Sequence, residues 1–165
     1  MKKVAVIMGS DSDFKVVQKA VLKLKEFNVP YEVRVISAHR TPDEAAEFSK
    51  NAKDNGFGVI IAAAGMAAHL GGVLAAHTTL PIIGIPIKSA AFDGMDALLA
   101  TVMMPPGVPV ATVGVDGAAN AAILAVQMLA VGDDSLNEKL EAMKKSMAEG
   151  VRKKDEDIKR KAMEL

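Results

Sequence analysis

Short continuous runs of apolar or β-branched residues recur along the chain, and each has the length of a β-strand. They predict five strands: Val4–Met8, Tyr31–Ile36, Val59–Ala64, Ile82–Ile87 and Val108–Val113. Strands that are apolar on both faces are typical of a parallel sheet covered by helices on each side. Gly84 and Pro86 leave the length of the fourth strand open, because both residue types weaken strands.

Between these strands, apolar residues spaced three and four apart predict amphipathic helices. The first such face carries Phe14, Val17, Val21 and Leu24. Further helices are expected from Thr41-Pro42 to about Asn55-Gly56, over Gly94–Met103 up to the break at Pro105-Pro106, and over Ala118–Val131. The regular alternation of strands and helices predicts a three-layer α/β sandwich with a parallel sheet and right-handed crossovers.

The C-terminal segment differs from the rest of the chain because it is highly charged and carries one apolar stripe. The stripe consists of Leu136, Leu140, Met143, Met147 and Val151, which predicts one long helix. This stripe either folds back on its own domain or lies on a neighbouring subunit. Since the chain has no internal repeat or low-complexity linker, we expect a single α/β domain over residues 1–165, with about 135–165 as a helical extension.

Composition excludes several classes of protein. Half of the 165 residues are hydrophobic and 24% are charged, as in a globular domain. Lys+Arg and Asp+Glu number 20 each, so the charge gives no reason to expect nucleic acid or an anionic membrane as a partner. No run reaches the roughly 18 apolar residues of a membrane span, and no signal peptide is visible. The absence of cysteine excludes thiolate chemistry and fits a cytoplasmic protein.

The most informative stretch, Ser37–Pro42, lies between the second strand and the following helix. Thr41, Pro42 and Glu44 form a helix-start signal, with Thr41 as the N-cap and Glu44 completing a capping box. In an open parallel sheet, such a turn lies at the carboxyl ends of the strands, where ligands bind. Arg40 can clamp a phosphate and His39 can exchange a proton near neutral pH. The alternative is that this pair simply solvates the turn.

The loop after the first strand, Gly9–Asp13, is rich in small polar residues. Glycine lets the backbone approach a ligand, and the hydroxyls of Ser10 and Ser12 can hold phosphate oxygens beside a helix start. A carboxylate is a poor phosphate contact, so Asp13 is better suited to a ribose diol. The alternative is that one of Asp11, Ser12 and Asp13 only caps the helix.

The loop after the third strand, Ala64–Gly72, is nearly bare of side chains apart from Met66, His69 and Leu70. Such a loop leaves a compact, dry cavity that suits a flat ring or a small neutral molecule. His69 is either a second proton donor or a packing histidine, and His77 is interpreted as structural, within a helical stretch. No G-x-S-x-G elbow and no zinc-type histidine spacing is present, which leaves a cofactor-free site for a phosphorylated ribose compound.

Three motifs, Met8–Asp13, Ser37–Pro42 and Ala67–Leu70, occur in this order, each at a strand end. With them the chain resembles the 5-(carboxyamino)imidazole ribonucleotide mutase family of purine biosynthesis over roughly residues 3–130. The resemblance implies a flavodoxin-like sandwich that forms a homo-octamer with sites shared between subunits.

It also implies that Ser10, Asp13 and Arg40 bind the ribonucleotide with help from Ser12 and Ser37, and that His39 transfers the proton at imidazole C4. The N-carboxylate leaves as carbon dioxide, which C4 then captures. The loop that includes Gly65, Met66 and Ala67 can confine the carbon dioxide, and no metal or other cofactor is needed.

Several positions depart from the family pattern. Met66 stands where the family usually has a second glycine, Gly71 replaces a proline, Met103 a glutamine and Pro106 a glycine, and the segment at Val115–Ala118 is short. These differences affect the carbon dioxide pocket rather than the proposed catalytic groups. Two other functions stay open: direct carboxylation of aminoimidazole ribonucleotide, against which Arg40 and His69 argue, and a non-catalytic flavodoxin-like nucleotide-binding module.

Overall fold

A five-stranded parallel sheet forms the centre of the computed structural model, which describes residues 1–165. Its strands are β1 (Lys3–Met8), β2 (Tyr31–Val35), β3 (Phe57–Gly65), β4 (Ile82–Ile87) and β5 (Ala111–Thr112). They lie in the order β2-β1-β3-β4-β5, which is the flavodoxin-like order. In this order the carboxyl ends of β1, β2 and β3 are neighbours, so the three loops singled out in the sequence meet at one edge.

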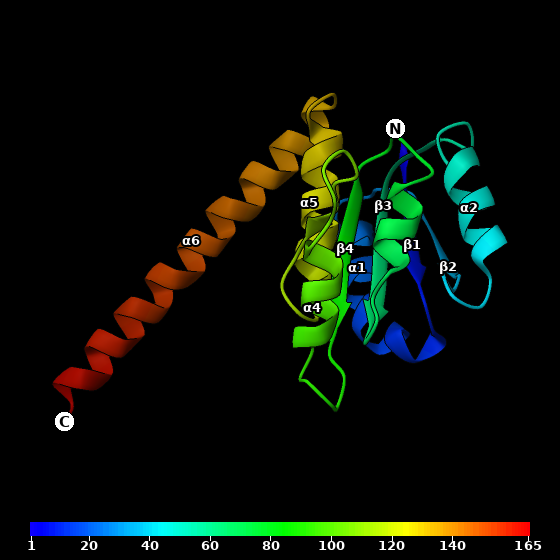
Figure 1. Ribbon diagram of the computed structural model, residues 1–165. Helices are drawn as coiled ribbons and strands as arrows, with labels where there is room; N and C mark the ends of the chain where they lie inside the picture. Colours follow the sequence, from blue (N-terminus) through cyan, green and yellow to red (C-terminus); the bar gives the residue numbers. More distant parts are fainter.

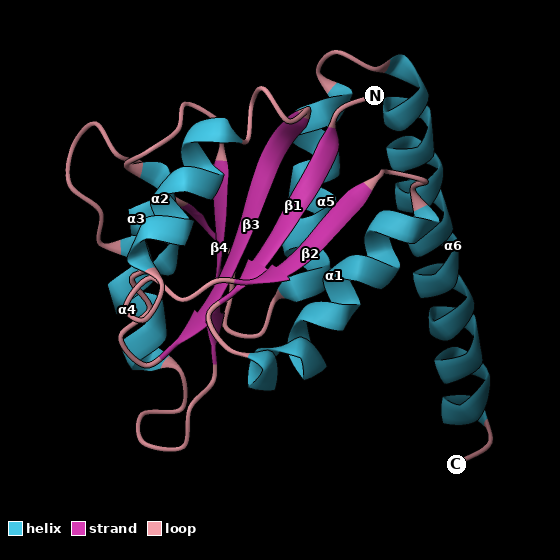
Figure 2. Ribbon diagram, turned by 90° about the vertical axis from the view of Figure 1, so that its right-hand side faces the viewer, coloured by secondary structure: helices cyan, strands magenta, loops and turns pink.

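Helices cover both faces of the sheet, which confirms the predicted three-layer sandwich (Figure 2). One face is covered by α1 (Phe14–Glu26) and α5 (Ala118–Ala130), and the other by α2 (Pro42–Asn51), α3 (Leu70–Ala75) and α4 (Met95–Val102). Alternate residues of β1 serve the two cores: Val4, Val6 and Met8 face α1 and α5, whereas Ala5 and Ile7 face the opposite layer. The strands are therefore apolar throughout because both of their faces are buried.

Gly84 and Pro86 do not shorten β4, which has the predicted bounds. Gly84 lets α4 approach closely, because a β-carbon there would collide with the side chain of Thr101. The carbonyl of Pro86 accepts a hydrogen bond from the backbone N–H of Asp116 at 2.9 Å. Both residues thus have a specific place in the strand.

Three predicted elements differ from the structure. The fifth strand covers only two residues instead of Val108–Val113, since the backbone N–H of Val108 donates to the carbonyl of Pro105 at 3.2 Å and belongs to a turn rather than to the ladder. Helix α2 ends at Asn51, and a turn that closes at Gly56, with φ +84°, takes up the remaining predicted helix. His77 lies in the turn after α3 and not within a helix. No helix is long and apolar enough to cross a bilayer.

The last element, α6 (Asp134–Met163), is a helix of 30 residues that leaves the body of the molecule (Figure 1). Leu136 and Leu140 are buried in the core on the α5 side, and Met143 is half-buried there. The next two members of the apolar stripe, Met147 and Val151, are 55% and 65% exposed. The chain's own domain therefore covers only the first part of the stripe.

Candidate active site

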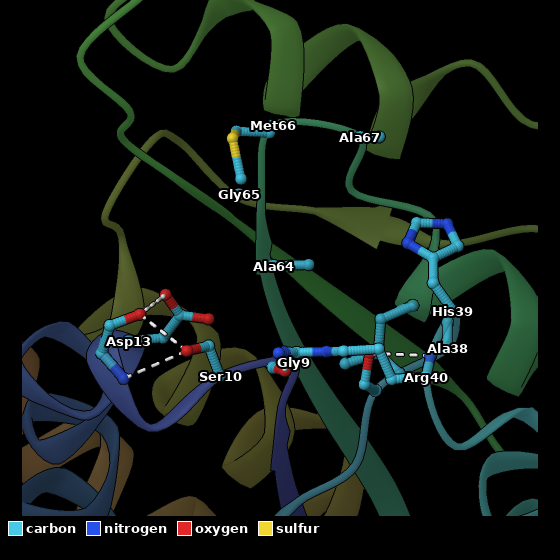
Figure 3. Close-up of a pocket in the computed structure, with 13 residues that line it drawn as sticks. Gly9, Ser10, Asp13, Ala38, His39, Arg40, Ala64, Gly65, Met66 and Ala67 are labelled. Atoms are coloured by element: carbon cyan, nitrogen blue, oxygen red, sulfur yellow. Dashed lines mark hydrogen bonds between the residues drawn. The ribbon is translucent and has the colours of Figure 1, made fainter.

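A cavity of about 460 Å³ opens at the carboxyl ends of β1, β2 and β3 (Figure 3). Nine of the ten predicted site residues line it: Ser10, Ser12, Asp13, Ser37, His39, Arg40, Gly65, Met66 and Ala67. The tenth, His69, does not line the cavity but touches His39. The structure thus brings residues from three loops, far apart in the sequence, to one place.

Hydrogen bonds hold the first loop in a short 3-10 turn, Asp11–Asp13, ahead of α1. Ser10 is its N-cap, since the Ser10 hydroxyl accepts a hydrogen bond from the backbone N–H of Ser12 at 3.3 Å. The Ser12 hydroxyl donates to the Ser10 hydroxyl oxygen at 2.8 Å. Asp13 occupies the N-cap position of α1 but makes no side-chain capping bond. The Asp11 carboxylate accepts from the same N–H of Ser12 at 3.1 Å, so Ser10 and Asp11 share it. The Asp13 carboxyl lines the cavity.

The pKa of Asp13 lies above its ordinary value, chiefly because burial disfavours the charged carboxylate. The nearby carboxylates of Asp11 and Asp116 raise it further, while hydrogen bonds from Ser10 and Ser12 oppose the shift. A partly desolvated carboxyl of this kind is suited to hydrogen bonding with neutral hydroxyls, and it repels a phosphate.

The second loop is closed by the side chain of Thr41, which the sequence predicts to cap the following helix. The Thr41 hydroxyl accepts from the backbone N–H of Ser37 at 3.0 Å and lies 3.1 Å from the Ser37 carbonyl oxygen. Thr41 is the N-cap residue of α2, as predicted, but its side chain makes no capping bond. Its backbone N–H donates to the Ser37 carbonyl at 2.8 Å instead of to Glu44, so the predicted capping box is wrong. The hydroxyl rigidifies the turn that presents His39 and Arg40.

Arg40 ties the second loop to the first. Its Nη2 donates to the carbonyl oxygen of Gly9 at 3.0 Å, and its Nε donates to the Ser37 hydroxyl at 3.3 Å. Both acceptors are neutral, so the positive charge of the guanidinium remains at the cavity wall. A guanidinium oriented in this way can fork onto two oxygens of a phosphate.

His39 and His69 form a direct pair. Their rings meet edge to face at an interplanar angle of 89°, and Nε2 of His39 lies 2.9 Å from Nδ1 of His69. One ring must donate and the other accept, so the two tautomers are coupled. Because both side chains are exposed rather than packed into the core, the geometry favours a polar role for His69 over a packing role.

The third loop supplies a wall almost without polar side chains. Gly65 ends β3 in a tight place, since a β-carbon there would lie 3.2 Å from the carbonyl oxygen of Ile87. The backbone then turns through Met66, whose φ is +52°. Hydrogen bonds from Ala68 N–H to Met66 O and from His69 N–H to Ala67 O, both 2.9 Å, fix the turn. The result is an end of the cavity whose side chains, those of Met66 and Ala67, are apolar.

Sequence reasoning missed some contributors to the cavity. Gly9, Ala38, Ala64 and Leu70 also line it, and each lies within a stretch that the sequence analysis singles out, without being named there as a site residue. Asp116 reaches the charge environment of Asp13 from the loop after β5, held by a 3.0 Å hydrogen bond from the backbone N–H of Lys88. No local sequence signal places Asp116 there. No group of three or more His, Asp or Glu side chains is arranged to hold a metal ion.

Known proteins are similar to this chain over most of its length. The family model described as AIR carboxylase matches residues 3–150. The N5-carboxyaminoimidazole ribonucleotide mutase of Pyrococcus abyssi is 54% identical over 147 residues, which cover 89% of this chain and 84% of the relative. The mutase of the same name from Mycobacterium leprae is 52% identical over 158 residues, covering 96% and 92%. The crystal structure of Treponema denticola PurE superposes with a TM-score of 0.86 at 27% identity, covering 93% of this chain and 96% of that one.

Proposed function

The chain belongs to the AIR carboxylase family. Because relatives named N5-carboxyaminoimidazole ribonucleotide mutase are 54% and 52% identical over most of its length, we propose that it is a mutase of purine biosynthesis. It converts 5-carboxyaminoimidazole ribonucleotide to 4-carboxy-5-aminoimidazole ribonucleotide. The observation that carries this proposal is the convergence of His39, Arg40 and the small-residue loop Gly65–Ala67 on one cavity. This arrangement offers an anion clamp, a proton carrier and an apolar compartment side by side, which are the three things the reaction needs.

The phosphate end of the substrate is bound by Arg40 together with the hydroxyls of Ser10, Ser12 and Ser37. Arg40 is held by neutral acceptors, so a phosphate can take over its donors as a charge-assisted contact. Asp13 accepts hydrogen bonds from the ribose hydroxyls. Anchoring the nucleotide at this end fixes the imidazole opposite His39, which supplies much of the catalytic advantage through orientation.

The reaction moves one carboxyl group from N5 to C4, and in exchange one proton is added at N5 and one is removed from C4. The bond between N5 and the carboxylate carbon breaks, its electron pair stays on nitrogen, and His39 delivers a proton there. Carbon dioxide and aminoimidazole ribonucleotide are then both in the cavity. C4 attacks carbon dioxide to form the new carbon–carbon bond, and His39 removes the C4 proton as aromaticity returns. His39 ends in its starting protonation state, and no oxidant, reductant or nucleoside triphosphate is consumed.

His69 supports His39 in both proton transfers. Its Nδ1 lies 2.9 Å from Nε2 of His39, so it fixes the tautomer and the plane of the ring between turnovers. When His39 swings its Nε2 to the substrate, His69 can take or supply the shared proton. We therefore assign His69 to proton handling beside His39 rather than to substrate binding.

Direct carboxylation of aminoimidazole ribonucleotide is the second candidate, because the matching family is described by that activity. An absorbance assay separates the two functions: one arm contains the N-carboxylated substrate at low bicarbonate, and the other aminoimidazole ribonucleotide with high carbon dioxide. A mutase forms product in the first arm without ATP, metal or added cofactor. Product in the second arm alone would assign the carboxylase activity instead.

We also propose that the protein is a homo-oligomer, an octamer as the family resemblance implies, with one domain per chain. Two apolar surfaces support association: the outer part of the α6 stripe, and a face of α4 and its flanks. That second surface, the α4 face, consists of Phe92, Met95, Leu99, Val102 and Met103, each 46–76% exposed. A closed symmetric assembly would remove both surfaces from water. A cytoplasmic location remains a prediction that rests on the cysteine-free composition.

A further inference from the structure

Met66 carries an unusual backbone conformation for its residue type. Four non-glycine residues have a positive φ: Asn28 at 57°, Met66 at 52°, Asp93 at 57° and Asp116 at 55°. Three of these are Asn or Asp, whose short polar side chains tolerate the left-handed region. Met66 is the exception, and it is the one member of the four that lines the cavity. Strained residues of this kind persist where the surrounding structure imposes them, typically at functional sites.

Packing of the Met66 side chain in the core does not offset this strain, because the residue is 67% exposed. Glycine would relieve the strain with little loss of buried surface. A methionine at this position is therefore not accounted for by packing within its own chain, which leaves a contact with a bound molecule or with a second copy.

The position of Met66 indicates what that contact is. The residue sits between Gly65 and Ala67, at the end of the cavity remote from Arg40 and Asp13 (Figure 3). The nucleotide phosphate and ribose occupy the Arg40 and Asp13 end, so the freed carbon dioxide is at the Met66 end. A flexible thioether can cover a small neutral molecule there without offering it a nucleophile or a hydrogen-bond donor.

We propose that Met66 is the residue that retains carbon dioxide, and this inference rests on the mutase function proposed above. With nucleotide bound, its thioether lies over the apolar end of the cavity. It thereby sets the fraction of carbon dioxide that C4 captures rather than the fraction that escapes to solvent. The residue is a specificity determinant: it favours internal transfer of the substrate's own carboxyl group over exchange with dissolved carbon dioxide.

The test follows the carboxyl carbon. Substrate labelled with carbon-13 in the N-carboxylate is converted in unlabelled bicarbonate, and the label in the product is measured by mass spectrometry. The wild-type enzyme and Met66→Leu, which keeps an apolar side chain of similar size, should retain the label. Met66→Gly should lower the ratio of retained to exchanged carbon by about tenfold, a change of about 1.4 kcal/mol in relative barrier heights. Free aminoimidazole ribonucleotide should accumulate in the glycine variant.

Stability and size measurements complete the test. Met66→Gly should keep or raise the Tm, since it relieves the left-handed strain, so loss of label cannot come from unfolding. Equal label retention in the wild type and Met66→Gly would overturn the proposal. So would a fall in molecular mass of Met66→Gly in light scattering at unchanged retention, which would make Met66 a contact between copies. If the wild-type enzyme forms no product from the N-carboxylated substrate, the mutase function itself fails, and the retention role fails with it.

Discussion

His39 and His69 come from loops 30 residues apart in the sequence, yet Nε2 of one lies 2.9 Å from Nδ1 of the other. The loop after β2 and the turn before α3 can meet because only one strand, β1, separates β2 from β3 in the sheet. A proton carrier that must donate to nitrogen and then accept from carbon needs both protonation states within one turnover. A second imidazole in direct contact can accept a hydrogen bond from the protonated ring and donate one to the neutral ring.

Replacing His39 tests the proton carrier. His39→Asn keeps a polar side chain of similar reach but cannot exchange a proton, so kcat should fall by orders of magnitude while nucleotide affinity stays close to wild type. The measurements are a steady-state assay with the N-carboxylated substrate and a calorimetric titration with product nucleotide. A loss of affinity as large as the loss of turnover would contradict the assignment.

Arg40→Ala is expected to have the opposite signature. Removing the guanidinium takes away a charge-assisted contact with the phosphate, which should weaken binding by roughly 1.5–3 kcal/mol. KM should rise far more than kcat falls. The same calorimetric titration measures this change, and Arg34→Ala provides a control because Arg34 stacks over Phe48, outside the cavity lining. Unchanged affinity in Arg40→Ala would remove this residue from the phosphate site.

His69 should be revealed by turnover rather than by binding. Without His69, His39 loses its hydrogen-bonding partner and its preferred tautomer, so kcat of His69→Ala should fall while nucleotide affinity stays close to wild type. The loss of kcat should be smaller than in His39→Asn because the reacting imidazole remains. An unchanged kcat in His69→Ala would exclude a role in proton handling. His77→Ala, outside the cavity lining, is the matched control.

How far the sequence predicts this site depends on whether a contact is local. The sequence predicts that the Ser37–Pro42 turn and the Gly9–Asp13 loop each lie at the carboxyl end of a strand, and the observed sheet order makes them neighbours. The sequence does not predict that the Thr41 hydroxyl closes the turn instead of capping α2, since both arrangements use the same residues. Asp116 was missed because its approach to Asp13 depends on a loop after an edge strand of only two residues.

Asp13 gives a stability prediction with a defined sign. Its folded-state pKa is raised above the ordinary value of 3.8, mainly by burial, so the folded protein favours the neutral carboxyl. Stability linked to this group is fully present below pH 3.8 and is lost as pH rises through the folded-state pKa. Asp13→Asn should therefore raise the Tm relative to wild type at pH 7, and the gain should shrink as the pH is lowered toward 3.8.

Differential scanning calorimetry over that pH range measures the effect. The matched control is Asp54→Asn, which changes an exposed aspartate in the turn after α2 and is measured at the same pH values. A lower Tm for Asp13→Asn at pH 7 would mean that the ionised carboxylate stabilises the fold, which contradicts the effect of burial. Loss of nucleotide affinity in the same variant would add support for the ribose contact.

Truncation of α6 tests whether its exposed part takes part in assembly, and the position of the truncation follows from which residues of the stripe are buried. Truncation just after Asp134 would remove Leu136 and Leu140, which belong to the domain's own core, and would confuse folding with assembly. Truncation after Lys145 keeps these two residues and removes Met147 and Val151, the exposed part of the stripe. Burial of that part on a neighbouring subunit is worth roughly 25 cal/mol per Å² of apolar area, so its loss should weaken association.

The truncated protein should therefore keep a cooperative unfolding transition but show a smaller mass in light scattering and reduced activity, although no proposed catalytic residue is deleted. Leu99→Glu, which places a charge on the α4 face, tests the second apolar surface in the same way. Leu22→Glu on α1, also exposed but outside both surfaces, is the control and should keep the wild-type mass. Wild-type mass and activity in the truncated protein would show that the outer part of α6 is dispensable, and a fully active full-length monomer would exclude shared sites altogether.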